Sequence, residues 1–577
     1  MTVMKKVLSL ALILIGITAH AQIDSVRHRI FLLGDAGDLV NGFHPVVDWL
    51  KKNVDWNDER NIAIYLGDNI YPYGLPTEGE PDYQVSKQIM DYEISLVKDK
   101  KAKAYFIPGN HDWWNGKIGG WQRVQNQVDY INGQQLSNVE AWPTNGCPGP
   151  ITVEVDTQLV VVLADSQWFL YVHDKPGPGS NCQTKTLDEF TIELEEIINT
   201  HPNQLVMLAM HHPLYSEGVH GGAYTWKQHI FPFAEAVKGL YIPLPIIGSV
   251  YPLARGVFGT VQDFNHPVYR AMAKEIETVL RRHPNTMSVA GHDHSQQLLM
   301  KDSMPFIVSG AVAELTRVRR NNKNLLYADV NYGFSMVEVT KSGKVNTKFY
   351  NLTSPNLATP NYNREVMTIK QTVAPVYNDS IGPLPETVTV AANDKLEEGW
   401  LRNALVGRNY RKEWTQPVTV PVLDLTKEQG GMRPVRKGGG KQTKSLRLED
   451  KNGKEWALRS IEKFPEAAIP ADLRQTFAKD IVEQGVSASY PYASLSYSTF
   501  AEAAGVPLIR RKLVYVPNDP KLERFRSDFA NVLAILEERE PANVKKTYNT
   551  DELVIRLAKD NDDHVDQRAV LKARLVD

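Results

Sequence analysis

Residues 104–112 read Ala-Tyr-Phe-Ile-Pro-Gly-Asn-His-Asp, a short apolar run followed directly by polar residues. The run from Ala104 to Ile107 has the length of a buried strand, and Pro108-Gly109 marks a turn after it. Asn110, His111 and Asp112 therefore stand in the loop that follows the strand. A polar block in this position is typical of a ligand-binding loop in an α/β domain.

The same order of apolar run and polar block occurs five times between residues 30 and 294. The runs lie at 30–33, 62–66, 104–107, 205–210 and 287–290, and the blocks are Gly34-Asp35, Gly67-Asp68-Asn69, Gly109-Asn110-His111-Asp112, His211-His212-Pro213 and Gly291-His292-Asp293-His294. A further apolar run covers 159–164, and helical patterns occupy 188–200 and 268–282. This alternation predicts a layered α/β fold in which the loops at the strand ends converge on one site.

The polar blocks together contain the side chains that a two-metal centre needs. Two metal ions ~3.5–4 Å apart can activate water and hold phosphate oxygens, and a carboxylate can bridge them. The candidate ligands are Asp35, Asp68, Asn110, His211, His292 and His294. A single Gly-Asp pair or a single histidine is more often structural, but the ordered set of five blocks favours a metal site.

These blocks resemble the signature blocks of the calcineurin-like metallophosphoesterases, and most of all those of the purple, or tartrate-resistant, acid phosphatases. Two details carry the narrower resemblance: Tyr71 stands three residues after Asp68, and His220 stands nine residues after His211. The resemblance covers residues 29–352. It implies an α/β fold with a layered β-sandwich flanked by helices, and a phosphatase activity.

The resemblance also implies a role for each residue of the site. Asp35, Asp68, Tyr71 and His294 would bind the first metal, and Asp68, Asn110, His211 and His292 would bind the second, with Asp68 as the bridge. The first ion would be Fe(III), held by the Tyr71 phenolate, and the second would be iron, zinc or manganese. His111 and His220 would contact the phosphate and protonate the leaving oxygen.

Our expectations for other residues near the blocks are less specific. His212 would lie near the metals without binding one, and Ala36 and His212 both depart from the residues usual in that family. We expect Asp112 to take part in the catalytic site by orienting a histidine, as carboxylates behind metal sites often do. Trp113, Trp114 and Trp121 could form an aromatic rim for a leaving group or simply a packing cluster.

The first 21 residues have the layout of a secretory signal peptide. Lys5 and Lys6 precede an apolar run at 7–17, and Ala19-His20-Ala21 offers small residues for cleavage. The alternative is an uncleaved membrane anchor, which the short apolar run disfavours. In an oxidising compartment Cys147 and Cys182, the two cysteines of the chain, could form one disulfide or remain two buried thiols.

The chain of 577 residues is long enough for more than one domain. We expect a phosphoesterase domain at 26–352, a linker at 353–378 that is rich in Pro, Asn and Thr, and an α+β region of unknown function at 379–577. In that region 445–461 predicts a hairpin, and helical patterns occupy 473–483, 521–540 and 550–559. A helical pattern at 566–577 runs to the end without a capping glycine, so the chain is either a fragment or frays there.

Together these features predict an exported phosphomonoesterase that uses a metal-bound hydroxide on a small phosphorylated substrate. Two alternatives are a phosphodiesterase or nucleotide pyrophosphatase, and an envelope assembly module with a vestigial phosphatase domain. The net charge of −2 offers no basic field, so we expect no nucleic-acid partner. We expect the protein in the periplasm or secreted, in association with the cell envelope.

Overall fold

The structure is a computed structural model that describes residues 24–177, 180–221, 230–231, 241–244, 259–371, 382–396, 399–400, 403, 407–438, 443–463, 484–540, 547, 553–554, 556–557 and 562–576. The chain forms two compact units: residues 1–176, 201–274 and 283–371 make the first, and residues 177–200, 275–282 and 372–577 make the second. The expected signal peptide at 1–21 and the helix expected at 473–483 lie outside the described residues.

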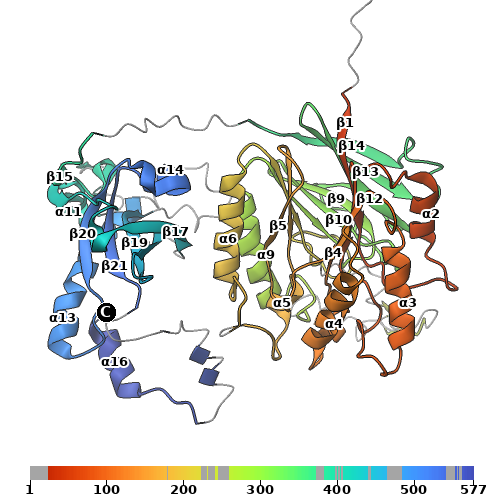
Figure 1. Cartoon of the computed structure of the whole chain (residues 1–577), viewed down its shortest axis with the longest axis horizontal. Helices are drawn as coiled ribbons and strands as arrows, with labels where there is room; N and C mark the ends of the chain where they lie inside the picture. The colour runs from red at the N-terminus through yellow and green to blue at the C-terminus, as the bar shows by residue number, and fades with distance from the viewer. Residues whose placement is uncertain are drawn as a thin grey trace, which may run out of the picture. The chain divides into compact units, whose positions relative to one another are not determined.

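Two seven-stranded sheets form the first unit (Figure 1). In sheet order, the first sheet is β14 (Tyr362–Thr368), β13 (Lys344–Asn351), β12 (Gly333–Thr340), β1 (Val26–Leu33), β2 (Asn61–Leu66), β3 (Lys103–Ile107) and β4 (Val139–Ala141). The second sheet is β11 (Leu325–Asp329), β9 (Gln296–Lys301), β10 (Met304–Ser309), β8 (Thr286–Ala290), β7 (Leu205–Ala209), β6 (Leu159–Leu163) and β5 (Ile151–Glu154).

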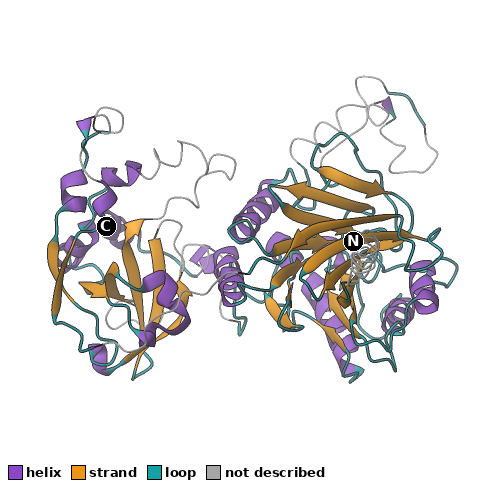
Figure 2. Cartoon of the chain, turned by 90° about the horizontal axis from the view of Figure 1, so that it is seen from above, coloured by secondary structure: helices purple, strands orange, loops and turns teal. Residues whose placement is uncertain are grey.

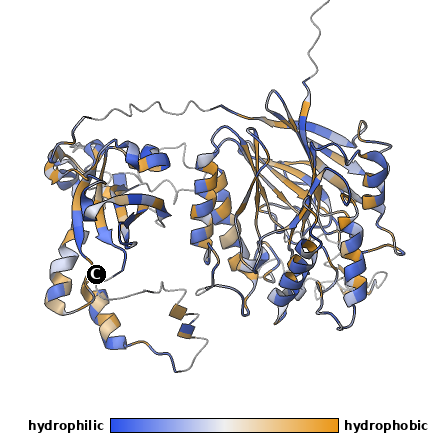
Figure 3. Cartoon of the chain, viewed as in Figure 1, coloured by the Kyte–Doolittle hydropathy of each residue, from blue (hydrophilic) through white to orange (hydrophobic). Residues whose placement is uncertain are grey.

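Both faces of the central strands of the first sheet are buried. Along β1, Ile30 and Leu32 join the apolar core shared with β6, β7 and β8 of the second sheet. Phe31 and Leu33 point to the opposite face and pack with α2 (Pro45–Asn53), α3 (Tyr83–Ile94) and α4 (Gly120–Gly133). This is why the central strands have continuous apolar sequences rather than alternating ones, and Figure 3 shows much orange in the interior of this unit. The predicted sandwich flanked by helices is confirmed.

Parallel pairing brings the polar blocks to one edge of the sandwich. Strands β1, β2, β3 and β4 are mutually parallel, as are β6, β7, β8 and β10. All carboxyl ends within each set therefore meet at the same edge. The backbone N–H of Gly34 donates to Ser309 O over 2.9 Å and joins the two sheets there.

The second unit has a five-stranded antiparallel sheet with its own apolar core (Figure 2). Its order is β17 (Met432–Gly438), β18 (Thr443–Asp450), β19 (Glu455–Lys463), β21 (Val532–Glu538) and β20 (Arg511–Val516), beside a two-stranded sheet of β15 (Thr387–Val390) and β16 (Val418–Pro421). The other α-helices that the structure describes are α5 (Gln167–Leu170), α6 (Leu187–Thr200), α9 (Pro267–Leu280), α11 (Arg411–Thr415), α13 (Tyr497–Ala504), α14 (Arg526–Phe529) and α16 (Gln567–Val576). Across the described ranges, no helix is both long and apolar enough to cross a membrane.

The structure corrects two expectations outside the site. The helix expected at 521–540 is wrong, because β21 occupies Val532–Glu538 and pairs with β19 and β20. The segment expected to be a linker at 353–378 contains β14, which pairs with β13 and buries Val366. The hairpin predicted at 445–461 is confirmed as β18 and β19. Cys147 and Cys182 are both disulfide-bonded.

Candidate metal centre

The candidate ligands lie in loops that directly follow strands, and three of them adopt an unusual backbone conformation. Asp35 follows β1, Asp68 follows β2 and His292 follows β8, and their φ angles are 57°, 54° and 70°. A non-glycine residue in the left-handed region costs about 1–3 kcal/mol in unfavourable cases, and such residues concentrate at functional sites. Three of them at one edge of a sandwich indicate a site that the fold holds under strain.

Gly67 shows why a glycine precedes the ligand in these blocks. Its φ is 88°, and a Cβ added there would lie 2.7 Å from the Nδ1 of His211 and 2.7 Å from the backbone N of Gly109. Only glycine allows the β2 and β3 loops to approach each other this closely. The close approach places Asp68 next to the loop that carries Asn110 and His111.

Tyr71 lies at the centre of a first group of donor atoms. Its hydroxyl oxygen lies 3.1 Å from Asp35 Oδ1, 3.2 Å from Asp68 Oδ2 and 3.2 Å from His294 Nε2. These four residues come from the loops after β1, β2 and β8. They are the four residues expected to bind the first metal, and their donor atoms meet at one point.

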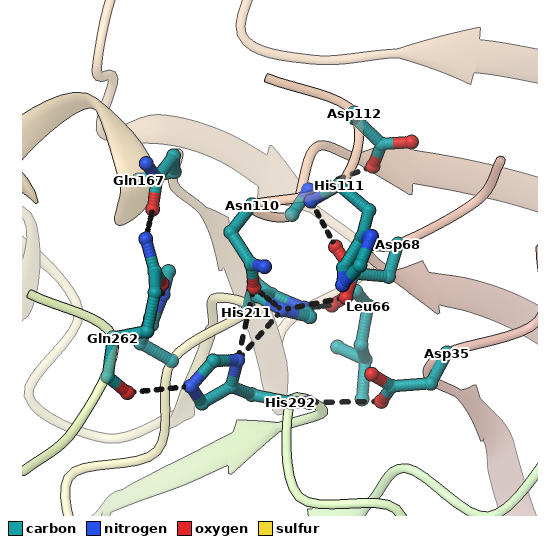
Figure 4. Close-up of polar contacts among 12 residues, drawn as sticks. Asp35, Leu66, Asp68, Asn110, His111, Asp112, Gln167, His211, Gln262 and His292 are labelled. Carbon is teal, nitrogen blue, oxygen red and sulfur yellow. Dashed lines mark hydrogen bonds and ion pairs between the residues drawn. The ribbon is translucent and has the colours of Figure 1, made fainter. Parts of the chain in front are cut away.

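A second group of donor atoms surrounds the amide oxygen of Asn110 (Figure 4). Asn110 Oδ1 lies 3.0 Å from His211 Nε2 and 3.0 Å from His292 Nδ1, and these two nitrogens are 3.2 Å apart. The other ring nitrogens are engaged: His211 Nδ1–H donates to Leu66 O and His292 Nε2–H donates to Gln262 O. Each imidazole therefore directs its other ring nitrogen toward Asn110.

One carboxylate oxygen belongs to both groups. Asp68 Oδ2 lies 3.2 Å from the Tyr71 hydroxyl and 3.4 Å from His211 Nε2. Its other oxygen, Oδ1, accepts the backbone N–H of His111 over 2.8 Å, which fixes the orientation of the carboxylate. This is the arrangement that a bridging ligand between two metal ions requires.

The electrostatics differ between the two sides of the site. Burial would lower the pKa of His211 and of His294, but Asp68 raises that of His211 to about 9, and Asp35 and Glu314 raise that of His294 to about 10. Burial and the neighbouring histidines hold the pKa of His292 well below its usual range, so its imidazole is neutral. Burial and the charge of Asp35 raise the pKa of Tyr71 well above its usual value.

His111 and His220 lie at the edges of the two groups. The ring of His111 is 4.5 Å from the ring of Tyr71, and the ring of His220 is 4.0 Å from that of His292. His111 Nδ1–H donates to Pro72 O over 2.8 Å, and His220 Nδ1–H donates to Asp263 Oδ1 over 3.0 Å. Both histidines thus have Nδ1 engaged and keep Nε2 for a ligand.

Asp112 has a different role from the one expected. It accepts hydrogen bonds from the backbone N–H groups of Asn69, Ile70 and Gly109, and none of its bonds within the described residues reaches a histidine. Sequence proximity suggested the histidine contact, but full burial instead places the carboxylate among backbone donors. Asp112 therefore joins the loop after β2 to the loop after β3 and supports the site by fixing these two loops.

His212 lies beside the donor group with both ring nitrogens engaged elsewhere, and Trp113 packs in the core. His212 bonds Ser166 Oγ through Nδ1 and Gln262 Oε1 through Nε2, so both ring nitrogens are already engaged. Trp113 is fully buried in the core beside α4 and donates its indole N–H to Asp165. Of the three tryptophans considered for a rim, Trp113 is therefore a packing residue.

Three supporting residues were missed at the sequence level. Glu314 lies 3.0 Å from His294 Nδ1, Asp263 holds His220, and Gln262 contacts both His292 and His212. Carboxylates and carbonyls of this kind orient metal-binding imidazoles. Glu314 does follow an apolar run, at 304–308, and Gly310, so the pattern used for the other blocks could have found it, whereas Gln262 and Asp263 follow only the short Val257-Phe258-Gly259.

The donor set fits a pair of metal ions. The carboxylate oxygens of Asp35 and Asp68 and a nitrogen of His211 lie within 4.8 Å of one another, and so do nitrogens of His211, His212 and His292. Two buried carboxylates and a buried phenol oxygen in contact repel one another once ionised, and a cation would offset this repulsion. Hard oxygen donors on one side and imidazoles on both suit iron, zinc or manganese.

The sequence of the first unit matches the model of a known protein family. The family model of the calcineurin-like phosphoesterases matches residues 28–241, and the first unit therefore contains a calcineurin-like phosphoesterase domain. The matched span includes Asp35, Asp68, Asn110, His211 and His220 and ends before His292 and His294. This match suggests the class of phosphoester hydrolases.

Solved structures with a related fold are distant from this chain. They include GAP50, the anchor in the inner membrane complex of Plasmodium, at 15% identity and a TM-score of 0.35, covering 60% of this chain and 90% of that one. The purple acid phosphatase PPD1 from yellow lupin has 12% identity, a TM-score of 0.36 and coverage of 58% and 53%. PhoD has 8% identity, a TM-score of 0.35 and coverage of 59% and 69%. No curated protein matches the chain.

Proposed function

We propose that this chain is an exported phosphomonoesterase with a binuclear metal centre of the purple acid phosphatase type. The observation that carries the proposal is the shared oxygen Asp68 Oδ2, which lies between the Tyr71 group and the Asn110 group. A single metal site would need only one of these groups. Two groups of donors with one common carboxylate are what two adjacent ions need.

The Tyr71 group suits a trivalent ion. It offers three hard oxygens, from Asp35, Asp68 and Tyr71, and one imidazole, whereas the Asn110 group offers two imidazoles and one neutral amide. We therefore propose Fe(III) in the first site and iron, zinc or manganese in the second. When bound, the pair would activate water and neutralise charge on the phosphoryl group.

His111 and His220 supply the proton chemistry of the chain. Each has its Nδ1–H tied to an oxygen acceptor, from Pro72 or Asp263, so Nε2 is left to hold or donate a proton. Such a histidine can hydrogen-bond a phosphate oxygen and then protonate the departing oxygen, which typically contributes about 10²–10⁴-fold. The acceptors fix the ring orientation before substrate binds.

The location outside the cytoplasm rests on two features. The N-terminal pattern at 1–21 is that of a signal peptide, and both cysteines are disulfide-bonded, which suits an oxidising compartment. Cell fractionation with an antibody to the chain tests this part directly. Recovery of the intact chain in the cytoplasm would contradict it.

Metal analysis combined with two chromogenic substrates tests the enzymatic proposal. We expect two metal ions per chain and faster turnover of 4-nitrophenyl phosphate than of bis(4-nitrophenyl) phosphate. A preference for the diester would favour a phosphodiesterase, and a metal-free protein without turnover would contradict a working enzyme. Asp38→Ala is a matched control for ligand variants, because Asp38 is an exposed carboxylate three residues after Asp35.

A further inference from the structure

Lys117, in the loop that follows His111, places its ammonium group over two aromatic rings. Lys117 Nζ is 4.6 Å from the ring centroid of Tyr73 and 5.8 Å from that of Trp114. Lys117 is exposed, and Tyr73 retains 42% of its accessible surface. We refer to Tyr73, Trp114 and Lys117 as the Lys117 platform.

Backbone contacts attach the platform to His111 on both sides. His111 Nδ1–H donates to the carbonyl of Pro72, the residue before Tyr73. The backbone N–H of Trp114 donates to the carbonyl of His111 over 3.0 Å. A leaving group that takes its proton from His111 would therefore depart next to the platform.

The loop that carries the platform is held in a strained conformation. Trp114 and Asn115 have φ angles of 52° and 50°, which is rare for two consecutive residues and costly for a bulky aromatic one. The strain persists because Asn115 N–H donates to Asn110 O over 2.8 Å and the Tyr171 hydroxyl donates to Lys117 O over 2.8 Å. Strain maintained by such contacts concentrates at sites that bind ligands.

Two cations contact Trp114, and only one of them is neutralised. Arg123 lies 4.3 Å from the Trp114 ring and pairs with Glu80 over 3.6 Å. Lys117 forms no ion pair with any carboxylate among the residues that the structure describes. The face of an aromatic ring attracts an ammonium group, but the ring has no net charge and does not neutralise it. An anion is the ligand that such a charge would bind.

We propose that the Lys117 platform is a leaving-group subsite for a second phosphate. This rests on the proposed function, because the platform has a leaving group beside it only if His111 serves phosphoryl hydrolysis. The favoured substrates would carry a terminal phosphoryl group on another phosphate, as inorganic pyrophosphate and nucleoside diphosphates do. Water adds to the terminal phosphorus, the P–O bond to the inner phosphate breaks, and the departing oxygen takes one proton.

Selectivity between two substrates tests the subsite. Lys117→Gln should lower the ratio of kcat/KM for pyrophosphate to kcat/KM for phenyl phosphate by about tenfold, since hydrogen bonds to charged groups are worth about 1.5 kcal/mol or more. Lys117→Arg should restore most of the ratio, and Tyr73→Leu should lower it by less. Lys87→Gln is the matched control, because Lys87, on helix α3, also places its Nζ over a tyrosine ring, 6.0 Å from the centroid of Tyr130.

The outcomes separate the subsite from the proposed function. An unchanged ratio in Lys117→Gln, or a decrease that Lys87→Gln reproduces, would overturn the subsite. If the metal-loaded chain hydrolyses neither substrate, the proposed function fails, and calorimetry with pyrophosphate then judges the subsite alone. Weaker pyrophosphate binding by Lys117→Gln than by the unchanged chain would support it, and equal binding would reject it.

Discussion

At the scale of single residues, the two carboxylate oxygens of Asp68 make different contacts. Oδ1 accepts the His111 backbone N–H, and Oδ2 lies between Tyr71 and His211. Burial would raise the pKa of Asp68, but the charges of His211 and His111 hold it below its usual range, so the carboxylate is ionised. An ionised and fully oriented carboxylate is the group that should matter most to both metals.

Asp68→Ala should therefore release more than one metal ion per chain and abolish phosphatase activity. Elemental analysis of the purified variant measures the first effect, and 4-nitrophenyl phosphate turnover measures the second. Asp38→Ala should retain both metals. If Asp68→Ala keeps two ions and normal turnover, Asp68 is not the bridge.

Tyr71→Phe should separate the ferric assignment from the metal site in general. Only a strongly Lewis-acidic ion holds a phenolate near neutral pH, because the unperturbed pKa of tyrosine is about 10. We expect a coloured wild-type protein from phenolate-to-iron charge transfer and a colourless variant. An absorption spectrum in the visible range decides this, and a colourless, fully active wild-type protein would reject Fe(III) while leaving the two-metal site intact.

At the scale of elements, the strands before the site were predictable because they are buried on both faces. The run 62–66 has no polar interruption, and β2 indeed packs against helices on one face and the second sheet on the other. The helix predicted over the segment 532–538 is wrong: Leu, Ala and Glu favour a helix locally, but this segment pairs with β19 and β20 as a strand. Asp263 could not be predicted, since its partner His220 is distant in sequence, whereas Glu314 follows the apolar run at 304–308 and Gly310 and was overlooked.

Helix α2 depends on His44, whose imidazole caps its first turn. Val47 N–H donates to His44 Nδ1, and His44 Nε2–H donates to Ala36 O, so both bonds need the neutral ring. Burial lowers the pKa of His44 from 6.5 to about 4. Below pH 6.5 the unfolded state binds the proton more readily, so stability falls as pH drops from 6.5 toward 4.

Between pH 7 and pH 5 this linkage should cost about 2 kcal/mol of unfolding free energy in the wild-type protein. His44→Asn keeps a capping side chain but does not titrate, so its stability should fall less over the same interval. Urea unfolding of the two proteins at both pH values gives the comparison. His564→Asn, at an exposed position, should follow the wild type, and identical slopes for His44→Asn would exclude His44 as the source.

At the scale of the whole molecule, the gathered site belongs to the first unit alone. Every candidate ligand and both candidate acids fall between Asp35 and His294, within segments of that unit. The second unit has separate apolar clusters built on its own five strands. The chemistry should therefore not require the strands of the second unit, provided that the first sheet stays complete.

The place at which a shortened chain ends should decide whether the first unit keeps its stability. A chain ending at Leu352 loses β14, which pairs with β13, and thereby Val366 and Ile369, which are 8% and 5% exposed. It also loses the two hydrogen bonds of 2.7 Å between the Lys370 backbone and the Asn285 side chain. Burial of two such side chains is worth about 3–6 kcal/mol as an upper estimate.

We therefore expect residues 24–371 to fold, bind two metals and hydrolyse 4-nitrophenyl phosphate, and residues 24–352 to unfold at a clearly lower urea concentration. Equal midpoints for the two chains would show that β14 adds nothing to the first unit. Residues 177–200 and 275–282 group with the second unit. Both shortened chains keep these two segments without the rest of that unit, so these are the segments that we expect to lose stability. A soluble, metal-loaded but inactive 24–371 would mean that the second unit takes part in forming the site, because every donor atom would still be present.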